Sequence, residues 1–307
     1  PRTAGEDPGT QQRLFTQLDL GRHLDLPGVV RPREIVRSEG RSVLVLEVCE
    51  GRSLTSEVAE QVPLERAVSL ALAGAKILAG LHGSGVTHCA IRPDAFVVTA
   101  EGALTLVDLG SASRARRSRN GGSTLAPSPS LLPWTAPEAT GRINRGIDAR
   151  TDLYAWGVVM FQLLTGQTPF HSDDPLELLH RHLAVPAAAP SRLRTDAPPA
   201  LDRIVLKLLA KRPGDRYQTA RGLVADLERA EREIAAGTTP NFEPGREDLP
   251  DTLRIPGQPI GRDAELRTLL GAVDDAATGN PCVVTVRGPS GVGKSMKPWA
   301  TTLRMPM

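Results

Sequence analysis

The sequence predicts an α+β protein in which a short β-rich part precedes a mainly helical part and then the beginning of an α/β domain. Two β-rich runs, 29–36 and 43–48, flank a turn at Glu39-Gly40. From Pro63 onward, apolar residues recur at helical spacing in several segments. Near the end of the chain, a strand at 283–286 leads directly into a glycine-rich loop.

The composition is typical of a globular protein with a packed core. The chain has 307 residues, 40% of them hydrophobic, and a formal net charge of +2 at pH 7. A near-balanced charge gives no indication of nucleic acid or an anionic membrane as partner. The three cysteines show neither a disulfide framework nor metal-ligand spacing, which predicts a cytoplasmic protein. No membrane segment is predicted, because the nearest apolar run, 67–81, contains Lys76.

The first residues are predicted to form little structure. Residues 1–13 are polar and contain Gly and Pro, so we expect a disordered or truncated stub. Leucines at helical spacing follow and end at Leu26-Pro27-Gly28. A strong helix is predicted from Pro63 to Leu81, because proline is tolerated in the first turn and apolar residues line one face.

A short hairpin is predicted after this helix. The runs 96–98 and 104–107 flank a turn at Glu101-Gly102. His88 precedes this hairpin and Asp108 follows it, so both residues are expected at the same end.

The rest of the first 233 residues is predicted to be helical. The segment 152–165 is apolar nearly all round, which predicts a helix buried on every side. Asp174-Pro175 is a good helix start, and amphipathic helices are expected at 201–210 and 219–232. Residues 234–259 are acidic, punctuated by Pro and Gly, and without periodicity, so they are predicted to be a linker.

Motifs in the same order resemble those of bacterial eukaryotic-type Ser/Thr protein kinases. His88-Cys89-Ala90-Ile91-Arg92-Pro93-Asp94-Ala95 stands where that family has its catalytic loop, and Asp108-Leu109-Gly110 stands where it has its metal-binding turn. Ala136-Pro137-Glu138 resembles the end of the activation segment. The resemblance implies a protein-kinase-like fold over 14–233, with an incomplete N-lobe and a helical C-lobe.

The departures from the family's pattern fall on the residues that carry chemistry. Ala90 stands where the family has the Asp that accepts the substrate proton, and Ala95 stands where it has the Asn that holds a second magnesium ion. Arg92 replaces the loop lysine and keeps its charge but not its compactness. Only Asp108 remains as a metal ligand. The resemblance therefore implies a pseudokinase, in which binding of ATP and Mg²⁺ in the cleft is impaired.

Other roles follow from the same resemblance. The backbone of Glu47 to Cys49 would face an adenine ring, as the hinge of a kinase does. His88 and Asp152 would be structural, with Asp152 bonding back to the catalytic loop. Glu138 would form an ion pair with Arg216. Gln17 stands where the family has a helix Glu, and the Gly-rich loop would lie upstream of Pro1.

The glycine-rich loop near the end is a full phosphate-loop match in its strand-loop context. Its candidate nucleotide-binding residues are Gly288, Gly291, Gly293, Lys294 and Ser295. The glycines let backbone N–H groups approach phosphate oxygens, the lysine reaches the β/γ-phosphates, and the serine ligates magnesium.

This loop and the Gly-Arg-x-x-Glu motif at 261–265 are similar to the start of AAA/STAND-type P-loop ATPase domains. Large bacterial signalling proteins join such domains to kinase-like domains. Residues 260–307 are therefore predicted to be the truncated start of an ATPase domain, because Pro298 interrupts the expected helix and no second strand follows.

Three functions stay open on the sequence alone. The chain could be a regulatory kinase-like module, or an active Ser/Thr kinase with an atypical base such as Asp94 or Asp108. The third alternative assigns the chemistry to the ATPase half, with the kinase-like part as its regulator. The expected partners are proteins, as partner or substrate, and the downstream signalling modules of the parent chain.

Overall fold

The structure is a computed structural model that describes residues 8–38, 41–59, 62–114, 129–143 and 146–249, with a few positions between 267 and 278. It divides the chain into two units, Pro1–Leu249 and Pro250–Met307. The elements described below all belong to the first unit. The phosphate-loop motif at 288–295 lies outside the described residues.

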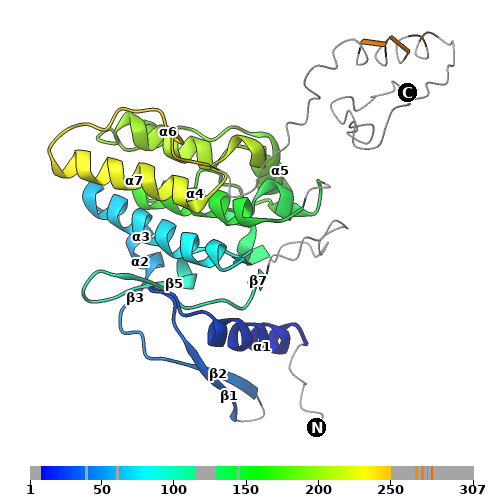
Figure 1. Ribbon diagram of the computed structural model, residues 1–307, viewed down its shortest axis with the longest axis vertical. Coiled ribbons are helices and arrows are strands. Elements are labelled where there is room, and N and C mark those ends of the chain that lie inside the picture. Colours follow the sequence, from blue (N-terminus) through cyan, green and yellow to red (C-terminus); the bar gives the residue numbers. More distant parts are fainter. Residues whose placement is uncertain are drawn as a thin grey trace, which may run out of the picture. The chain divides into compact units, whose positions relative to one another are not determined.

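The N-terminal part is a helix packed on a β-hairpin (Figure 1). Helix α1 spans Pro8–His23, and strands β1 (Pro32–Ser38) and β2 (Arg41–Leu46) pair antiparallel. Gly21 allows the close approach of α1 to β1, because a Cβ there would lie 2.3 Å from Cδ of Pro32. The hairpin confirms the two predicted strands. The helix, however, begins inside the segment predicted to be a disordered stub, since Pro8 is compatible with a first helical turn.

Short strands and two helices surround the predicted catalytic loop. Helices α2 (Leu54–Ala59) and α3 (Leu64–Gly83) precede it. One antiparallel sheet has the strand order β3-β5-β6, with β3 at Arg52–Ser53, β5 at Phe96–Val98 and β6 at Leu104–Leu106. A second, two-stranded sheet pairs β4 (Val86–Thr87) with β7 (Ser113–Arg114). The pairing of β5 with β6 confirms the predicted hairpin.

The C-terminal part is helical. Its helices are α4 (Ala149–Thr165), α5 (Pro175–Ala184), α6 (Pro199–Leu208) and α7 (Ala220–Ala235). Short 3-10 helices are Pro93–Ala95, Pro129–Trp134, Pro137–Thr140, Pro190–Arg192 and Pro213–Asp215. Helices α3 and α7 lie side by side (Figure 1).

Helix α4 forms the centre of the core, as its apolar sequence predicts. The indole nitrogen of Trp156 donates to the carbonyl oxygen of Ala71 on α3 at 3.2 Å. Its ring lies 5.3 Å from that of Phe96, measured between centroids. Gly74 provides the space for this indole, because a Cβ there would lie 2.0 Å from the Trp156 ring. The core therefore joins α3, α4 and the sheet that carries the loop residues.

The structure corrects the predicted linker, 234–259, for residues 234–249; residues 250–259 lie outside the described residues. Helix α7 continues to Ala235, and the chain then packs along α6 and α7 as far as Leu249. Asp248 accepts hydrogen bonds from the backbone nitrogens of Gln218 and Thr219 at 2.7 and 2.9 Å. Phe242 is buried, with the Arg229 guanidinium 4.1 Å from its ring centroid. The prediction failed because these anchors are single residues without periodic spacing.

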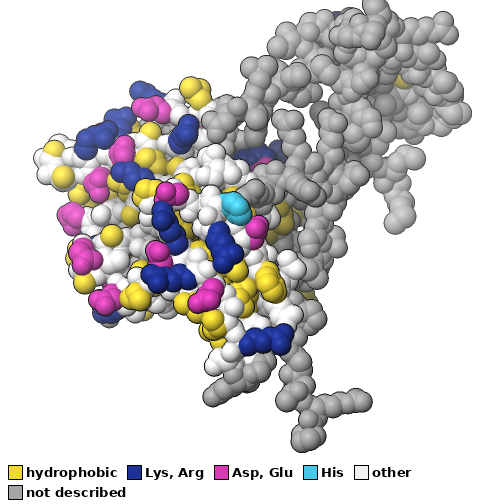
Figure 2. Space-filling model, turned by 60° about the horizontal axis from the view of Figure 1, so that its bottom comes forward, with side chains coloured by type: hydrophobic (Ala, Val, Ile, Leu, Met, Phe, Trp, Pro, Cys, Tyr) yellow, Lys and Arg dark blue, Asp and Glu magenta, His cyan; other side chains and the backbone are white. Residues whose placement is uncertain are grey.

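The surface charge is mixed. On the face shown in Figure 2, the basic and acidic side chains of the described residues are interspersed rather than gathered by sign. This distribution agrees with the net charge of +2.

Candidate functional site

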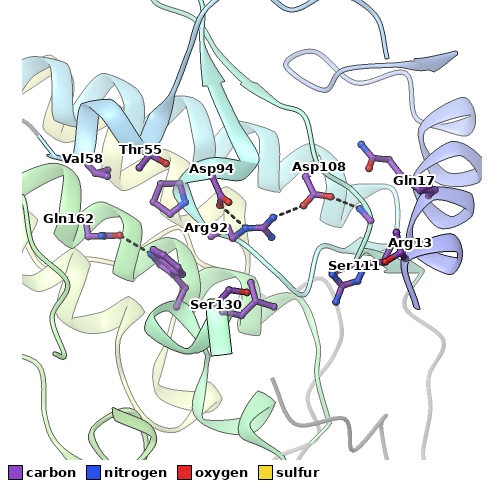
Figure 3. A pocket seen from close by; sticks show the side chains of 16 residues that line it. Arg13, Gln17, Thr55, Val58, Arg92, Asp94, Asp108, Ser111, Ser130 and Gln162 are labelled. Atoms are coloured by element: carbon purple, nitrogen blue, oxygen red, sulfur yellow. Dashed lines mark hydrogen bonds and ion pairs between the residues drawn. The ribbon is translucent and has the colours of Figure 1, made fainter. Parts of the chain in front are cut away.

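A cavity of about 670 Å³ lies between α1, α2 and the loops that flank β5 and β6 (Figure 3). In the part of the chain that the structure describes, its charged lining consists of Arg13, Arg92, Asp94 and Asp108. Three of these residues come from the two segments that resemble a catalytic loop and a metal-binding turn. We therefore take this cavity, called the cleft below, as the candidate functional site.

His88 connects the two segments. Its buried imidazole donates from Nε2 to the carbonyl oxygen of Asp108 at 2.6 Å, and its Nδ1 accepts from the backbone nitrogen of Ala90 at 3.2 Å. Together these bonds require a neutral ring with its hydrogen on Nε2. Burial lowers the pKa of His88, which favours the same neutral form. The residue therefore holds Asp108 against the loop and carries no charge.

Asp152 fixes the backbone of the loop. Its carboxylate accepts hydrogen bonds from the backbone nitrogens of His88 and Cys89, both at 2.8 Å, and from Nε2 of His82 at 2.9 Å. Cys89 has a φ of 64°, in the left-handed region that residues other than glycine rarely adopt. Burial, followed by the charge of Asp152, raises the pKa of the Cys89 thiol to about 12. Asp152 thus stabilises the unfavourable backbone conformation of Cys89, and it bonds back to the loop as the resemblance implied. The Cys89 thiol stays protonated and unreactive, mainly because it is buried.

Ala90 and Ala95 are both buried, with exposed fractions of 6% and 0%. A methyl group neither accepts a proton nor coordinates a metal ion. The backbone of Ala95 is part of the local packing, because its carbonyl oxygen accepts from the nitrogen of Val107 at 2.9 Å. The two alanines therefore contribute to the packing of the loop but carry no reactive group.

Arg92 lies between two carboxylates (Figure 3). Its Nε is 2.6 Å from Oδ1 of Asp94, and its Nη2 is 2.9 Å from Oδ2 of Asp108. The other oxygen of Asp108 accepts from the backbone nitrogen of Gly110 at 2.8 Å. Burial alone would lower the pKa of Arg92, but its bonds to Asp94 and Asp108 outweigh that effect and raise it. The guanidinium therefore stays charged and engages both acids.

The cleft does not fit the magnesium ion that the resemblance implies. Mg²⁺ requires near-octahedral oxygen ligation. Both oxygens of Asp108 are already engaged, and the charged group of Arg92 lies beside them. Within the described ranges, no group of three or more His, Cys, Asp or Glu side chains could hold a metal ion.

Two other polar contacts line the cleft. Gln17 of α1 donates from Nε2 to the carbonyl oxygen of Val107 at 2.6 Å, so it supports the strand that leads to Asp108. Trp134 donates from its indole nitrogen to Oε1 of Gln162 at 2.7 Å. Our sequence analysis gave Trp134 and Gln162 no role. Their pairing depends on the position of α4 beside the 3-10 helix, which residue spacing does not show.

An ion pair away from the cleft was predicted from the resemblance. Arg216 donates to both carboxylate oxygens of Glu138, at 2.7 and 2.8 Å, and both side chains are buried. The hydroxyl of Thr151 donates to the same carboxylate at 2.9 Å. Arg216 also donates to the backbone oxygens of Ala210 and Arg150 at 2.7 and 3.0 Å. The pair therefore ties three distant segments together.

Glu47 and Cys49, two of the remaining predicted nucleotide-binding residues, are not among the residues that line the cleft. The backbone nitrogen of Glu47 donates to the carbonyl oxygen of Arg31 at 2.9 Å, and Cys49 is half-buried. Their role at an adenine ring stays a prediction. Gly288, Gly291, Gly293, Lys294 and Ser295 lie outside the described residues.

The sequence of this chain matches the protein kinase domain over residues 2–226. Because this match covers most of the chain, the protein belongs to the protein kinase family. The α+β fold and its helical C-terminal part are those of a kinase domain.

The relatives of this chain include Ser/Thr protein kinases of bacteria. A probable serine/threonine-protein kinase of Clostridium perfringens is 31% identical over 217 residues, which cover 69% of this chain and 30% of that protein. The serine/threonine-protein kinase PknB of Mycolicibacterium smegmatis is 30% identical over 262 residues, covering 83% of this chain and 41% of PknB. Hybrid signal transduction histidine kinase G of Dictyostelium discoideum is 34% identical over 183 residues, 53% of this chain and 5% of that protein. This chain thus spans less than half the length of these relatives.

Among the helices that the structure describes, none combines the length and apolar character needed to cross a membrane.

Proposed function

We propose that this chain is a Ser/Thr protein kinase-like signalling module with impaired phosphotransfer, a pseudokinase that acts by binding protein partners. The kinase-like domain would extend over about 14–233, and the packing of the following segment supports a boundary closer to Leu249. Residues 260–307 would begin an AAA/STAND-type P-loop ATPase domain. A cytoplasmic location remains part of this proposal.

The observation that carries this proposal is the chemistry of the cleft. Ala90 and Ala95 supply no base and no metal ligand, while Arg92 is already ion-paired with both Asp94 and Asp108. Phosphoryl transfer depends on positioning and on metal-held charge, so these losses should reduce turnover by several orders of magnitude. The contacts of Asp152 with the loop backbone and of Glu138 with Arg216, by contrast, are present. A folded domain without its chemical groups is suited to binding rather than to catalysis.

The direct test is a phosphotransfer assay of the full-length natural protein with radiolabelled ATP, Mg²⁺ and a mixture of protein substrates. We expect incorporation at the background level, unchanged in Asp108→Ala. Robust incorporation that is lost in Asp108→Ala would refute the pseudokinase proposal. A thermal-shift measurement of the same two proteins verifies that both are folded.

A second candidate is an active kinase that uses an atypical base. The position of the Asp94 carboxylate on the cleft wall favours this alternative, although the carboxylate is bound to Arg92. An active kinase of this kind would lose turnover in Asp94→Asn. Under the pseudokinase proposal, Asp94→Asn changes nothing in the assay, whereas Ala90→Asp combined with Arg92→Lys and Ala95→Asn raises turnover above background.

The link to an ATPase rests on the phosphate-loop motif. The similarity to a hybrid signal transduction histidine kinase supports a multidomain signalling context, because the matched region is 5% of that protein. If the parent chain hydrolyses ATP through this motif, Lys294→Ala in the complete protein abolishes hydrolysis. Retained hydrolysis in Lys294→Ala would place that activity elsewhere.

A further inference from the structure

We propose that the Arg92 guanidinium acts as a built-in cation in place of a divalent metal ion, holding Asp94 and Asp108 together so that the cleft stays metal-free. This inference deepens the proposed function and rests on it. It concerns which cation is bound to Asp108, whereas the proposed function concerns the rate of phosphotransfer.

The geometry shows how one side chain can take this position. Adjacent nitrogens of the guanidinium, Nε and Nη2, each reach a different acid, at 2.6 and 2.9 Å. A planar group with several fixed donors can bridge two carboxylates in this way, whereas a lysine ammonium is a single point charge on a flexible stem. The substitution of the loop lysine by Arg92 therefore introduces a bridge as well as conserving a charge.

Asp108 is held in place from its other side. Its Oδ1 accepts from the backbone nitrogen of Gly110 at 2.8 Å, and its carbonyl oxygen accepts from His88 at 2.6 Å. The carboxylate cannot turn away from Arg92 without losing the Gly110 bond. Both the orientation of Asp108 and its bridging contact are therefore set by neighbouring groups.

The surrounding charges also disfavour a divalent cation. Arg13 lines the same cleft, and its Cβ would lie 3.3 Å from a Cβ placed on Gly110. Among the described residues, the charged lining then comprises two arginines and two aspartates, whose formal charges cancel. Mg²⁺ gives up its water ligands reluctantly. Carboxylates that are already hydrogen-bonded, in a lining whose charges cancel, do not compensate for the loss of those waters. The amide of Gln17 on the same wall adds no charge.

The experiment measures metal binding to the full chain without nucleotide, which separates it from any nucleotide-dependent metal at the phosphate loop. Wild type, Asp108→Asn, Arg92→Met and Arg92→Met/Asp108→Asn are titrated with Mn²⁺ by electron paramagnetic resonance and with Mg²⁺ by thermal shift. Arg181→Met is the matched control, because it removes an arginine from the exposed pair with Glu177.

We expect no Asp108-dependent Mn²⁺ binding and no Mg²⁺ shift in wild type or in Arg181→Met. Arg92→Met leaves two adjacent carboxylates without their cation, so it should melt earlier and gain a metal site. At a tenfold excess of Mg²⁺ over the dissociation constant, its Tm should rise by about 3–6 °C. The added Asp108→Asn change should abolish that rise.

Two results would overturn the inference. The first is Mn²⁺ binding by wild type that Asp108→Asn removes, which is decisive even if Arg92→Met does not fold. The second is a folded Arg92→Met that binds no more metal than wild type. Metal binding at Asp108 in a protein without phosphotransfer would refute this inference alone, whereas robust phosphotransfer would refute the proposed function.

Discussion

Two arginines of this molecule bridge acidic groups in different surroundings. Arg216 is fully buried, and its nitrogens donate to both oxygens of Glu138 and to backbone carbonyls. Arg92 lies in an open cleft with 23% of its side chain exposed, and it divides its donors between Asp94 and Asp108. Removing one partner of a buried pair leaves an uncompensated charge, whereas solvent screens a partly exposed pair. The two arginines therefore have similar contact distances to their acids but contribute differently to the free energy of unfolding.

The comparison distinguishes residues that stabilise the fold from residues of the candidate site. The structure contains the ion pair of Glu138 with Arg216 and the hydrogen bonds of Asp152 to the loop backbone. Ala90 and Ala95, which the sequence resemblance places at the family's reactive positions, carry no reactive group, and Arg92 is ion-paired with Asp108. Substitutions in the two regions should therefore have separable effects.

The largest loss of stability is expected for Arg216→Ala. It leaves the Glu138 carboxylate buried without its partner, which should lower the free energy of unfolding by about 3–5 kcal/mol. Urea unfolding followed by circular dichroism measures the change. Arg181→Ala in the exposed pair with Glu177 is the control and should cost less than about 1 kcal/mol. Equal losses in the two variants would show that burial does not distinguish the pairs.

The next effect is expected for Asp152→Asn. The amide places an NH₂ group opposite one of the two backbone donors, His88 or Cys89, and removes the charge. We expect a loss of about 2–3 kcal/mol. Amide hydrogen exchange at His88 and Cys89 should accelerate more than the global loss explains, because the loop opens locally. Unchanged local protection would contradict the view that Asp152 fixes this turn.

The free energy of unfolding is expected to depend on pH because of a buried histidine in the helical part. His182 is buried, and the Tyr154 hydroxyl hydrogen-bonds its Nδ1 at 2.9 Å. Burial, and then the charge of Lys211, lowers the pKa of His182 from 6.5 to about 3. Between these pH values the unfolded chain binds a proton that the folded protein excludes. Stability should therefore fall as the pH falls below 6.5, by up to about 1.4 kcal/mol per pH unit.

The variant that tests this dependence is His182→Gln, whose amide can still accept from Tyr154. Urea unfolding at several values between pH 6.5 and pH 4.5 gives the slope for both proteins. The variant should show a shallower slope, because its side chain does not titrate. Parallel slopes would assign the acid sensitivity to the carboxylates instead. No effect of this residue on the cleft is expected, since it packs against Phe170 on the helical side.

Much of the scaffold could be predicted from the sequence. The helices α3 and α4 have strong apolar patterns, and the contacts of Asp152 and of Glu138 with Arg216 followed from motifs in a known order. Such contacts join fixed points of a fold, so the order of motifs is sufficient to place them.

The arrangement of the cleft could not be predicted in the same way. The sequence places Arg92 near Asp94 and near the turn at Asp108, but the rotamer of a long side chain decides which acids it bridges. The packed segment after α7 was missed for a related reason, because its attachment depends on single anchors such as Asp248. Local patterns do not encode one-to-one contacts between distant residues.

The smallest effect is expected for Asp94→Asn, which sharpens the comparison of the two arginines. The contact of Asp94 with Arg92 is 2.6 Å, slightly shorter than the closest contact of Glu138 with Arg216, at 2.7 Å. The Asp94 side chain is nevertheless 58% exposed, so its loss should cost less than about 1 kcal/mol and still less at high salt. Urea unfolding at low and high NaCl measures both quantities. A loss as large as that of Arg216→Ala would mean that the bridge in the cleft is itself part of the scaffold. A small loss would mean that this bridge can change during evolution without unfolding the domain.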